Sequence, residues 1–336
     1  MFKRKILSTM NRLKLFRLFE QRSRRRLRVL MYHRFSEDAH PLRISSAEFE
    51  RHLKYLKTNA RVITIDEAID GLKGTRPLPD FSTVITIDDG YRDSYEIAYP
   101  LLKKYGLPAT MYAVSSFLEG KIWLWTDKTR FILEQTTLDR YETFIVGKKI
   151  SARLSDHASR LNAAAALNDT LKRMRNDDKE KALEKIANDL SVAVPERPPA
   201  EYSGFSSREA SEMAENGITI GSHTVSHPLM DKINASEQEK EAIDSRRRLE
   251  ELIGRDVWHF CYPNGSFDRG ARTAVEKAGH RSAVSSDFGQ CMPGDEIDIL
   301  RRIPAEADTL AFLQNFTGLE EFKRSIRSRY RTRSAL

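Results

Sequence analysis

Short apolar runs alternate with amphipathic stretches over the first third of the chain. The runs are rich in β-branched and aromatic residues, as buried strands are, and the stretches between them repeat their apolar positions at helical spacing. One such stretch ends at Gly106 and Pro108, residue types that terminate helices. The pattern predicts strands at 28–33, 62–65, 83–87 and 109–114, with helices at 46–58, 66–72 and 94–105.

The alternation stops between residues 116 and 205 and then resumes. The middle segment opens with Trp123-Leu124-Trp125, continues with helix-forming sequence at 161–174 and 178–190, and closes in a proline-rich stretch. We predict that 116–205 is a mainly helical insertion. Beyond it, the pattern predicts helices at 207–215, 236–253 and 268–278 and strands at 218–220, 257–261, 282–285 and 300–303.

Repeated strand and helix units favour an α/β fold with a parallel sheet or barrel and right-handed crossovers. Polar residues follow three of the predicted strands. They are Asp88-Asp89-Gly90, His223-Thr224-Val225-Ser226-His227 and Tyr262-Pro263-Asn264-Gly265. Because the carboxyl ends of parallel strands meet at one edge, we expect these residues to form a single site.

The composition describes a globular protein and argues against a membrane-spanning one. Of the 336 residues 40% are hydrophobic and 31% charged, and no apolar stretch approaches the roughly 20 residues needed to cross a bilayer. Polar residues at 11, 12, 14 and 17 interrupt the apolar run near the N-terminus, so we do not expect export by a signal peptide. Cys261 and Cys291 are too few for a disulfide framework, which predicts free thiols in the cytoplasm.

The net charge of +8 comes from the two tails. Residues 1–34 hold 12 Lys/Arg against one Glu, and residues 323–336 hold 6 Lys/Arg and no acid. We predict a basic amphipathic segment at 1–27 and a basic tail at 319–336. The first suits a helix lying on an anionic membrane surface, peripherally at the inner face of the cell membrane, or alternatively a helix packed on the domain with solvated charges. Nucleic acid is not expected as a partner, because no binding motif accompanies the charge.

One acid and two histidines four residues apart form a donor set for a divalent metal. Asp89, His223 and His227 fit the pattern of catalytic zinc, in which three protein ligands leave a position open for water. Adjacent carboxylates at a strand end point different ways, so Asp88 can face the metal-activated water as general base. The residues therefore indicate hydrolytic chemistry with zinc as cofactor.

The motifs Thr86-Ile87-Asp88-Asp89-Gly90, His223-Thr224-Val225-Ser226-His227 and Tyr262-Pro263-Asn264-Gly265 resemble, in order and spacing, the first three motifs of the polysaccharide deacetylases. This family is also called carbohydrate esterase family 4, with the NodB-homology domain. The resemblance implies a distorted (β/α)7-type barrel over 28–115 and 206–318. It also implies metal-dependent removal of an N-acetyl or related N-acyl group from a sugar in bacterial polysaccharide or glycolipid biosynthesis. A lipid-linked saccharide as substrate would explain the basic N-terminal segment.

Carried over residue by residue, the resemblance makes Asp88 the base and Asp89, His223 and His227 the ligands of zinc or a similar ion. The third motif departs from the family pattern, because Cys261 stands where an arginine usually orients the base.

The loop after Cys261 and the end of the chain leave further roles open. Asn264 replaces the usual tyrosine, although its backbone N–H could still stabilise the oxyanion, with Tyr262 and Pro263 beside the substrate. The late Leu-x-His motif, which supplies the general acid, has no match, so the acid is unassigned. Arg301 and Arg302 either help to orient Asp88 or flank an edge strand.

Two more residues are candidates for the site. His33 ends the first predicted strand and either reaches the rim of the site, where it could act in catalysis, or is a structural histidine. Trp125, like Trp123, either stacks on a sugar ring or packs the insertion onto the barrel.

Two other functions compete with the hydrolase. A glycan-binding homologue that keeps the metal but has lost turnover would account for Cys261 and for the missing late histidine. A glycosyltransferase could use the paired acids to hold a metal and a nucleotide sugar, but this function leaves His223 and His227 unexplained.

Overall fold

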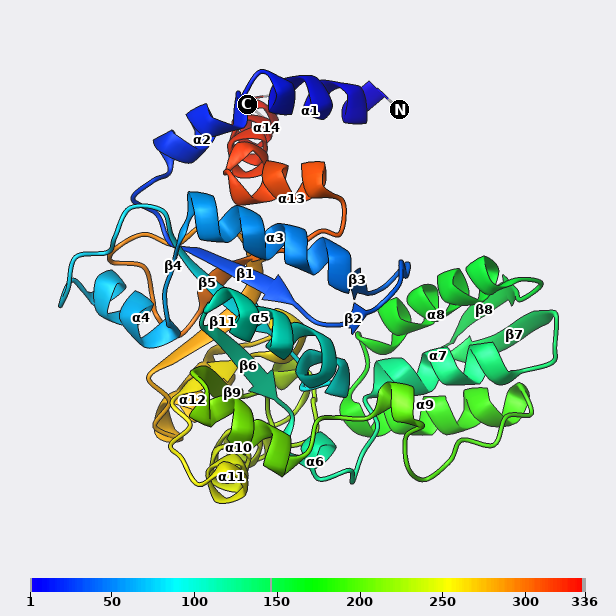
Figure 1. Ribbon diagram of the computed structural model, residues 1–336. Coiled ribbons are helices and arrows are strands. Elements are labelled where there is room, and N and C mark those ends of the chain that lie inside the picture. The colour runs from blue at the N-terminus through cyan, green and yellow to red at the C-terminus, as the bar shows by residue number, and fades with distance from the viewer. Residues whose placement is uncertain (1, 146, 334–336) are drawn as a thin grey trace.

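Seven parallel strands close into a barrel in the computed structural model, which describes residues 2–145 and 147–333 (Figure 1). Around the ring the order is β1, β12, β11, β10, β9, β6 and β5, and β5 pairs with β1 to complete it. The strands are β1 (Arg28–Tyr32), β5 (Ser82–Ile87), β6 (Ala109–Ala113), β9 (Ile218–Ser222), β10 (His259–Cys261), β11 (Ser282–Phe288) and β12 (Leu300–Pro304). The predicted (β/α)7-type barrel is confirmed.

The ring is closed by strands from the two ends of the barrel sequence. Leu30 of β1 pairs with Ile85 of β5 on one side and with Ile303 of β12 on the other. The ring is distorted, since β10 pairs with β9 only at Phe260 and Ser222. The short β4 (Arg61–Val62) lies outside the ring, paired with β5. Closure therefore places β1 directly beside the strand that carries the paired acids and β12 next beyond it, so residues near 30 and near 302 both lie on that side.

Helices cover the outside of the barrel, and their ends follow local sequence signals. Ser45, Thr64, Ser206 and Asn234 each begin a helix with a capping box that involves a glutamate three residues on. The predicted stop at Gly106 is confirmed, because that glycine adopts a φ of 60° directly after a helix. The helices are α3 (Ser46–Asn59), α4 (Ile65–Lys73), a π-helical turn (Ser94–Ala98) that runs into α5 (Tyr99–Tyr105), α10 (Ser207–Glu215), α11 (Ala235–Ile253), α12 (Arg269–Lys277) and α13 (Thr309–Phe316).

The insertion forms a lobe beside the barrel, at the right of Figure 1. It contains α6 (Ser115–Leu118), α7 (Trp125–Gln135), α8 (His157–Leu171) and α9 (Asn176–Asp189). It also contains an antiparallel hairpin that our prediction of a mainly helical segment did not include, β7 (Arg140–Ile145) and β8 (Lys148–Arg153). The signal is the alternation of buried Tyr141, Thr143 and Ile145 with exposed neighbours.

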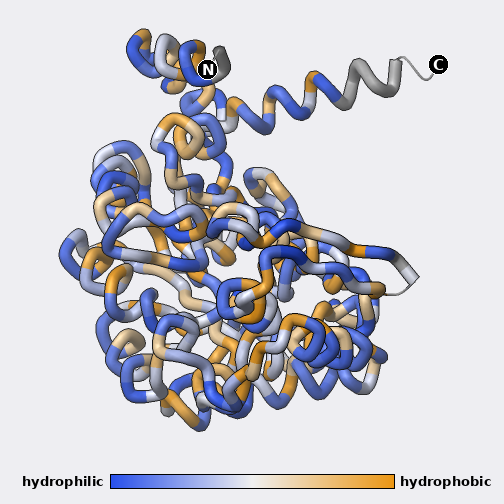
Figure 2. Tube along the Cα trace, turned by 90° about the vertical axis from the view of Figure 1, so that its right-hand side faces the viewer, coloured by the Kyte–Doolittle hydropathy of each residue, from blue (hydrophilic) through white to orange (hydrophobic). Residues whose placement is uncertain are grey.

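Both tails are helical. The N-terminal segment forms α1 (Phe2–Arg12) and α2 (Phe16–Arg22), and the C-terminal tail forms α14 (Leu319–Arg333), which extends away from the body in Figure 2. Leu7 of α1 is buried, and the rings of Phe19 and Phe322 lie 5.6 Å apart. Met1 and residues 334–336 of the two predicted tails lie outside the described residues. Within those residues, no helix is both long and apolar enough to cross a membrane.

Candidate metal and catalytic site

The paired acids and the two motif histidines meet at the carboxyl ends of the barrel strands. Asp88 and Asp89 directly follow β5, and His223 directly follows β9. The Nε2 atoms of His223 and His227 each lie 3.4 Å from Asp89 Oδ1. The donor atoms of these three residues all lie within 4.8 Å of one another, so the structure brings together the metal ligands that the sequence indicated.

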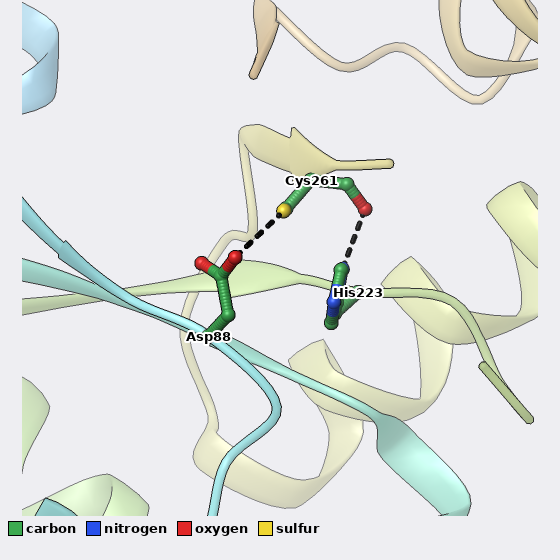
Figure 3. A group of neighbouring side chains, drawn as sticks. All are labelled: Asp88, His223 and Cys261. Atoms are coloured by element: carbon green, nitrogen blue, oxygen red, sulfur yellow. Dashed lines mark hydrogen bonds between the residues drawn. The ribbon is translucent and has the colours of Figure 1, made fainter. Parts of the chain in front are cut away.

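The orientation of His223 is set by a backbone carbonyl. Its Nδ1 lies 2.7 Å from the carbonyl oxygen of Cys261. A carbonyl can only accept a hydrogen bond, so Nδ1 carries a hydrogen, and Nε2, which lies beside Asp89, is the nitrogen that would be available to bind a metal. Figure 3 shows this bond as the dashed line between His223 and Cys261.

The carboxylate of Asp89 is held in its charged form. Burial alone would raise the pKa of Asp89, but hydrogen bonds from His223 and His227 outweigh that effect and hold it well below its ordinary value. One carboxylate oxygen and two imidazole nitrogens, which can release their hydrogens to bind a cation, are ligands that suit a divalent ion such as zinc. The residues present therefore fit a metal.

Asp88 lies close to His223 and Cys261, and its carboxylate is held by an arginine from another strand of the ring. Only 2% of the Asp88 side chain is exposed, and its Oδ1 accepts a hydrogen bond of 2.7 Å from Arg302 Nη1. Arg302 also donates to the Thr86 hydroxyl at 3.1 Å and to the Ser285 carbonyl at 2.7 Å. Arg301 points elsewhere and bonds Asp295. Arg302 thus contacts the predicted base, which is the first of the two roles left open for this pair. Arg301 does not.

Cys261 occupies the place of the usual motif arginine and joins the same network. Its thiol donates to Asp88 Oδ2 over 3.5 Å, as Figure 3 shows, and its sulfur accepts from Arg302 Nη2 over 3.3 Å. Burial would raise the pKa of Asp88, but the charge and hydrogen bond of Arg302, with smaller contributions from His33 and His223, hold it below its ordinary value. Asp88 is therefore ionised at neutral pH.

His33 lies at the rim of this site. Its Nε2 is 3.7 Å from Asp88 Oδ2, and 46% of its side chain is exposed. The ring consequently reaches both the base and solvent, which a histidine packed in the core would not do. Whether it takes part in catalysis stays a prediction.

The loop after β10 lies in a tight turn. Asn264 is exposed, has a φ of 53°, and accepts a hydrogen bond at its carbonyl from Ser286. Tyr262 and Pro263 are buried, and the Tyr262 ring packs against Phe260 and Phe267. The predicted oxyanion and substrate roles of this loop remain predictions.

Trp125 lies in the core of the insertion. It is 3% exposed, and the ammonium of Lys179 lies 4.7 Å from the centre of its ring. Because these contacts cover the Trp125 ring, the structure supports a role in packing the insertion and not in stacking on a sugar.

A polar cluster that the sequence analysis did not find joins the insertion to the loop after the base. The Tyr91 hydroxyl donates to Asp127 Oδ2 over 2.5 Å, and the guanidinium of Arg34 lies 3.8 Å from the Tyr91 ring centre and bonds Asp93. Burial raises the pKa of Asp127 to about 6. These residues come from three separate segments, and no local pattern connects them.

Comparison with known proteins agrees with this geometry. The profile of a family described as polysaccharide deacetylase matches residues 75–283, which is more than half of the chain. The chain belongs to the polysaccharide deacetylase family. The matched residues include both acids and both motif histidines, whereas β1 with His33 and β12 with Arg302 lie outside them.

Several family relatives are similar to this chain. YxkH of Bacillus subtilis, which bears the family's name, is 24% identical over 83% of this chain and 71% of its own length. A poly-beta-1,6-N-acetyl-D-glucosamine N-deacetylase of Staphylococcus aureus is 37% identical over 73 residues, which are 21% of this chain and 25% of that protein. The solved structure of the Streptococcus pyogenes deacetylase PplD in complex with acetate has a TM-score of 0.59 at 16% identity, covering 87% of this chain and 98% of that one. At this identity the last likeness shows the fold.

Proposed function

We propose that this polysaccharide deacetylase family member uses a divalent metal, with zinc as the ion its ligands favour, to remove an N-acetyl or related N-acyl group from a sugar. The observation that carries the proposal is the separation of two roles at one strand end. Asp89 faces His223 and His227, while Asp88 is held apart by Arg302. A metal ligand set with an independently held carboxylate beside it is what hydrolysis of an amide requires.

The residues divide the reaction between them. A divalent ion held by Asp89, His223 and His227 would supply Lewis-acid chemistry to the acyl carbonyl and to water. Asp88, ionised and fixed by Arg302, takes a proton from the attacking water. The oxygen of that water forms a bond to the acyl carbon, and negative charge on the carbonyl oxygen can be met by the backbone N–H of Asn264.

Breakdown of the amide needs a proton for the leaving nitrogen. We assign this role to His33, whose ring reaches both Asp88 and solvent. The carbon–nitrogen bond then breaks, and the products are a carboxylate, acetate in the case of an N-acetyl sugar, and a free amine on the sugar. This assignment fills the position left open by the missing late histidine.

The structure weakens the case for a binding protein without turnover. That alternative rested on the absent motif arginine and the absent late histidine. Arg302 supplies a guanidinium to Asp88 from another strand, and His33 supplies an imidazole at the rim. Family membership and the use of both histidines likewise disfavour a glycosyltransferase.

The test is release of acetate and formate from soluble and lipid-linked N-acyl sugars by the zinc-loaded protein. Asp88→Asn should abolish release and keep zinc binding, whereas the exposed Asp256→Asn should behave as wild type. Release by Asp88→Asn at the wild-type rate would refute the assigned base. Zinc binding without release from any of these sugars would favour the binding protein.

We also propose that the N-terminal helices rest on an anionic membrane surface, at the inner face of the cell membrane, where a lipid-linked saccharide would be presented. Arg4, Lys5, Ser8, Thr9 and Arg12 line a shallow groove with Leu310. In the same N-terminal segment, Ile6 is 45%, Leu13 59% and Leu18 66% exposed. Exposed apolar residues next to cations are typical of interfacial helices.

Vesicle cosedimentation tests this surface. Leu13→Asp with Leu18→Asp should weaken binding to phosphatidylglycerol vesicles, and Leu138→Asp, on the insertion and 43% exposed, should not. Wild-type protein that binds phosphatidylcholine vesicles equally well, or neither kind, would contradict an anionic surface as partner.

A further inference from the structure

The loop between the two motif histidines is held from two sides. On one side lies α11, and on the other lies α6, the first helix of the insertion. Neither element supplies a metal ligand, yet α11 binds two backbone N–H groups of the loop and α6 binds two of its carbonyls. Residues outside the family motifs therefore add to the hydrogen bond within the loop, from the His227 backbone N–H to the Thr224 hydroxyl.

Glu241 of α11 binds the loop most extensively. Its Oε2 accepts hydrogen bonds from the backbone N–H of Val225 at 2.6 Å and of Ser226 at 3.0 Å. Its Oε1 accepts from the Ser226 hydroxyl at 2.6 Å. Hydrogen bonds to a charged acceptor are stronger than those between neutral groups, so one carboxylate anchors two consecutive residues.

Helix α6 binds the carbonyls of the same loop. The backbone N–H of Ser115 donates to the Thr224 carbonyl and that of Ser116 donates to the Val225 carbonyl, both at 3.1 Å. Arg248 of α11 in turn bonds the Ser116 hydroxyl at 3.2 Å. The loop, α6 and α11 thus form one connected unit, and the start of the insertion is part of it.

The loop needs this support because its backbone is strained. Thr224 has a φ of 71° and His227 a φ of 60°. A left-handed conformation is uncommon outside glycine, and for a β-branched residue such as threonine it is an outlier. Such conformations persist only where surrounding contacts determine them. The strained conformation is also the one that turns both Nε2 atoms toward Asp89.

We infer that Glu241 is a positioning residue of the metal site, which fixes the backbone between His223 and His227 and so sets the aim of both ligands. This inference rests on the metal site of the proposed function. Groups that orient metal ligands typically change metal affinity or activity by about 10- to 100-fold when they are removed.

The test measures zinc affinity of the metal-stripped full chain by competition with a chromophoric chelator. Glu241→Ala should bind zinc about 10- to 100-fold more weakly than wild type. Glu241→Gln keeps an oxygen that can accept from the two backbone N–H groups, so it should recover much of the affinity. The matched control is Glu239→Ala on the same helix, where the side chain pairs with Lys277 at the surface and zinc affinity should not change.

Activity at saturating zinc separates positioning from a structural role. If Glu241 aims the ligands, excess zinc should raise kcat of Glu241→Ala toward wild type, because all three ligands remain. A residue that served only fold stability would lower Tm and leave the zinc affinity of the folded protein unchanged.

Zinc affinity of Glu241→Ala within twofold of wild type would overturn the inference. If Glu241→Ala does not fold by circular dichroism, Glu241→Asp decides in its place, since its shorter side chain cannot keep all three bonds, and an unchanged affinity there overturns the inference equally. His223→Ala distinguishes this failure from failure of the metal site itself. Loss of zinc in His223→Ala with no loss in the Glu241 variants rejects only the role of Glu241.

Discussion

Replacing Arg302 by methionine isolates the contact that holds the base. The substitution removes the guanidinium and keeps most of the apolar stem. Asp88 would then be a buried carboxylate, 2% exposed, with the Cys261 thiol and the half-exposed His33 ring beside it but without a guanidinium. The Thr86 hydroxyl and the Ser285 carbonyl would lose the same partner.

The expected loss of stability in Arg302→Met follows from the burial of the ion pair and from the distance between its atoms. Coulomb attraction across the 2.7 Å contact is about 6 kcal/mol at an effective dielectric constant of about 20, and desolvation of both groups offsets much of it. Removal of one partner of a buried pair typically costs about 3–5 kcal/mol, because the other charge is left without compensation. We therefore expect Arg302→Met to lower the free energy of unfolding of the metal-free protein by about 3–5 kcal/mol at pH 7.

The loss of stability in Arg302→Met should become smaller as the pH falls. In wild type the pKa of Asp88 is lowered by the pair, so its contribution to stability is present above the ordinary aspartate pKa and is lost as the pH falls further. Without Arg302, burial raises the pKa of Asp88, and the folded protein takes up a proton more readily than the unfolded chain. The difference between wild type and Arg302→Met should therefore shrink as the pH falls from 7 toward 4.

Urea unfolding of a double-mutant cycle is the assay. Asp88→Asn, Arg302→Met and the double variant are compared without metal, with Arg301→Met as the control on the adjacent, surface-facing arginine, which should cost less than about 1 kcal/mol. If an unpaired Asp88 causes the loss, Arg302→Met should cost much less in the Asp88→Asn background. Equal costs in both backgrounds, or a loss that does not vary with pH, would refute this reasoning.

Three further outcomes are expected. The pKa of Asp127 is raised to about 6 from an ordinary 3.8, so its ionisation should remove roughly 3 kcal/mol of stability as the pH rises from 4 to 7. Urea unfolding at several pH values should show that the free energy of unfolding depends less on pH in Asp127→Asn than in wild type. An equal dependence in both proteins would contradict the raised pKa. His33→Ala should lower kcat by roughly 10²- to 10⁴-fold and keep the zinc affinity of wild type. Stopped assays of product release measure the first, and chelator competition measures the second. A wild-type kcat would show that His33 is not the general acid. Leu133→Ala, in the insertion core and fully buried, should cost about 2–5 kcal/mol in chemical denaturation, against less than about 0.5 for the exposed Leu138→Ala; equal costs would show that the insertion is not packed as described.

The way the base is held bears on how this family member differs from the usual motif pattern. The motif position next to the base holds a small thiol, Cys261, in place of an arginine. The charge comes instead from Arg302 on β12, which lies two strands from β5 around the ring with β1 between them. His33, which directly follows the intervening β1, lies 3.7 Å from the same carboxylate. The strands β1 and β12 thus supply the histidine and the arginine beside Asp88, whereas the thiol of Cys261 comes from β10.

The chain's sequence by itself determined the features that depend on neighbouring residues. Strand and helix periods predicted an α/β fold with a parallel sheet or barrel, because burial of one face repeats locally along each element, and the motif resemblance then implied the (β/α)7-type barrel. The ligands Asp89, His223 and His227 were readable because each follows a recognisable strand within a few residues. The hairpin at β7 and β8 shows the limit, since its alternating pattern covers only a few residues inside a segment dominated by helical sequence.

Only the tertiary structure decided which distant residues act on those local motifs. Arg302 and Asp88 are 214 residues apart, and they meet because β1 pairs with both β5 and β12 when the barrel closes. Glu241 reaches the histidine loop because α11 packs beside β9, and Trp125 is buried because the insertion has a core of its own. Local patterns record which face of an element is buried, but they carry no information about which element will cover it. That choice is made by closure of the ring, and it determined how the base and the ligands are held.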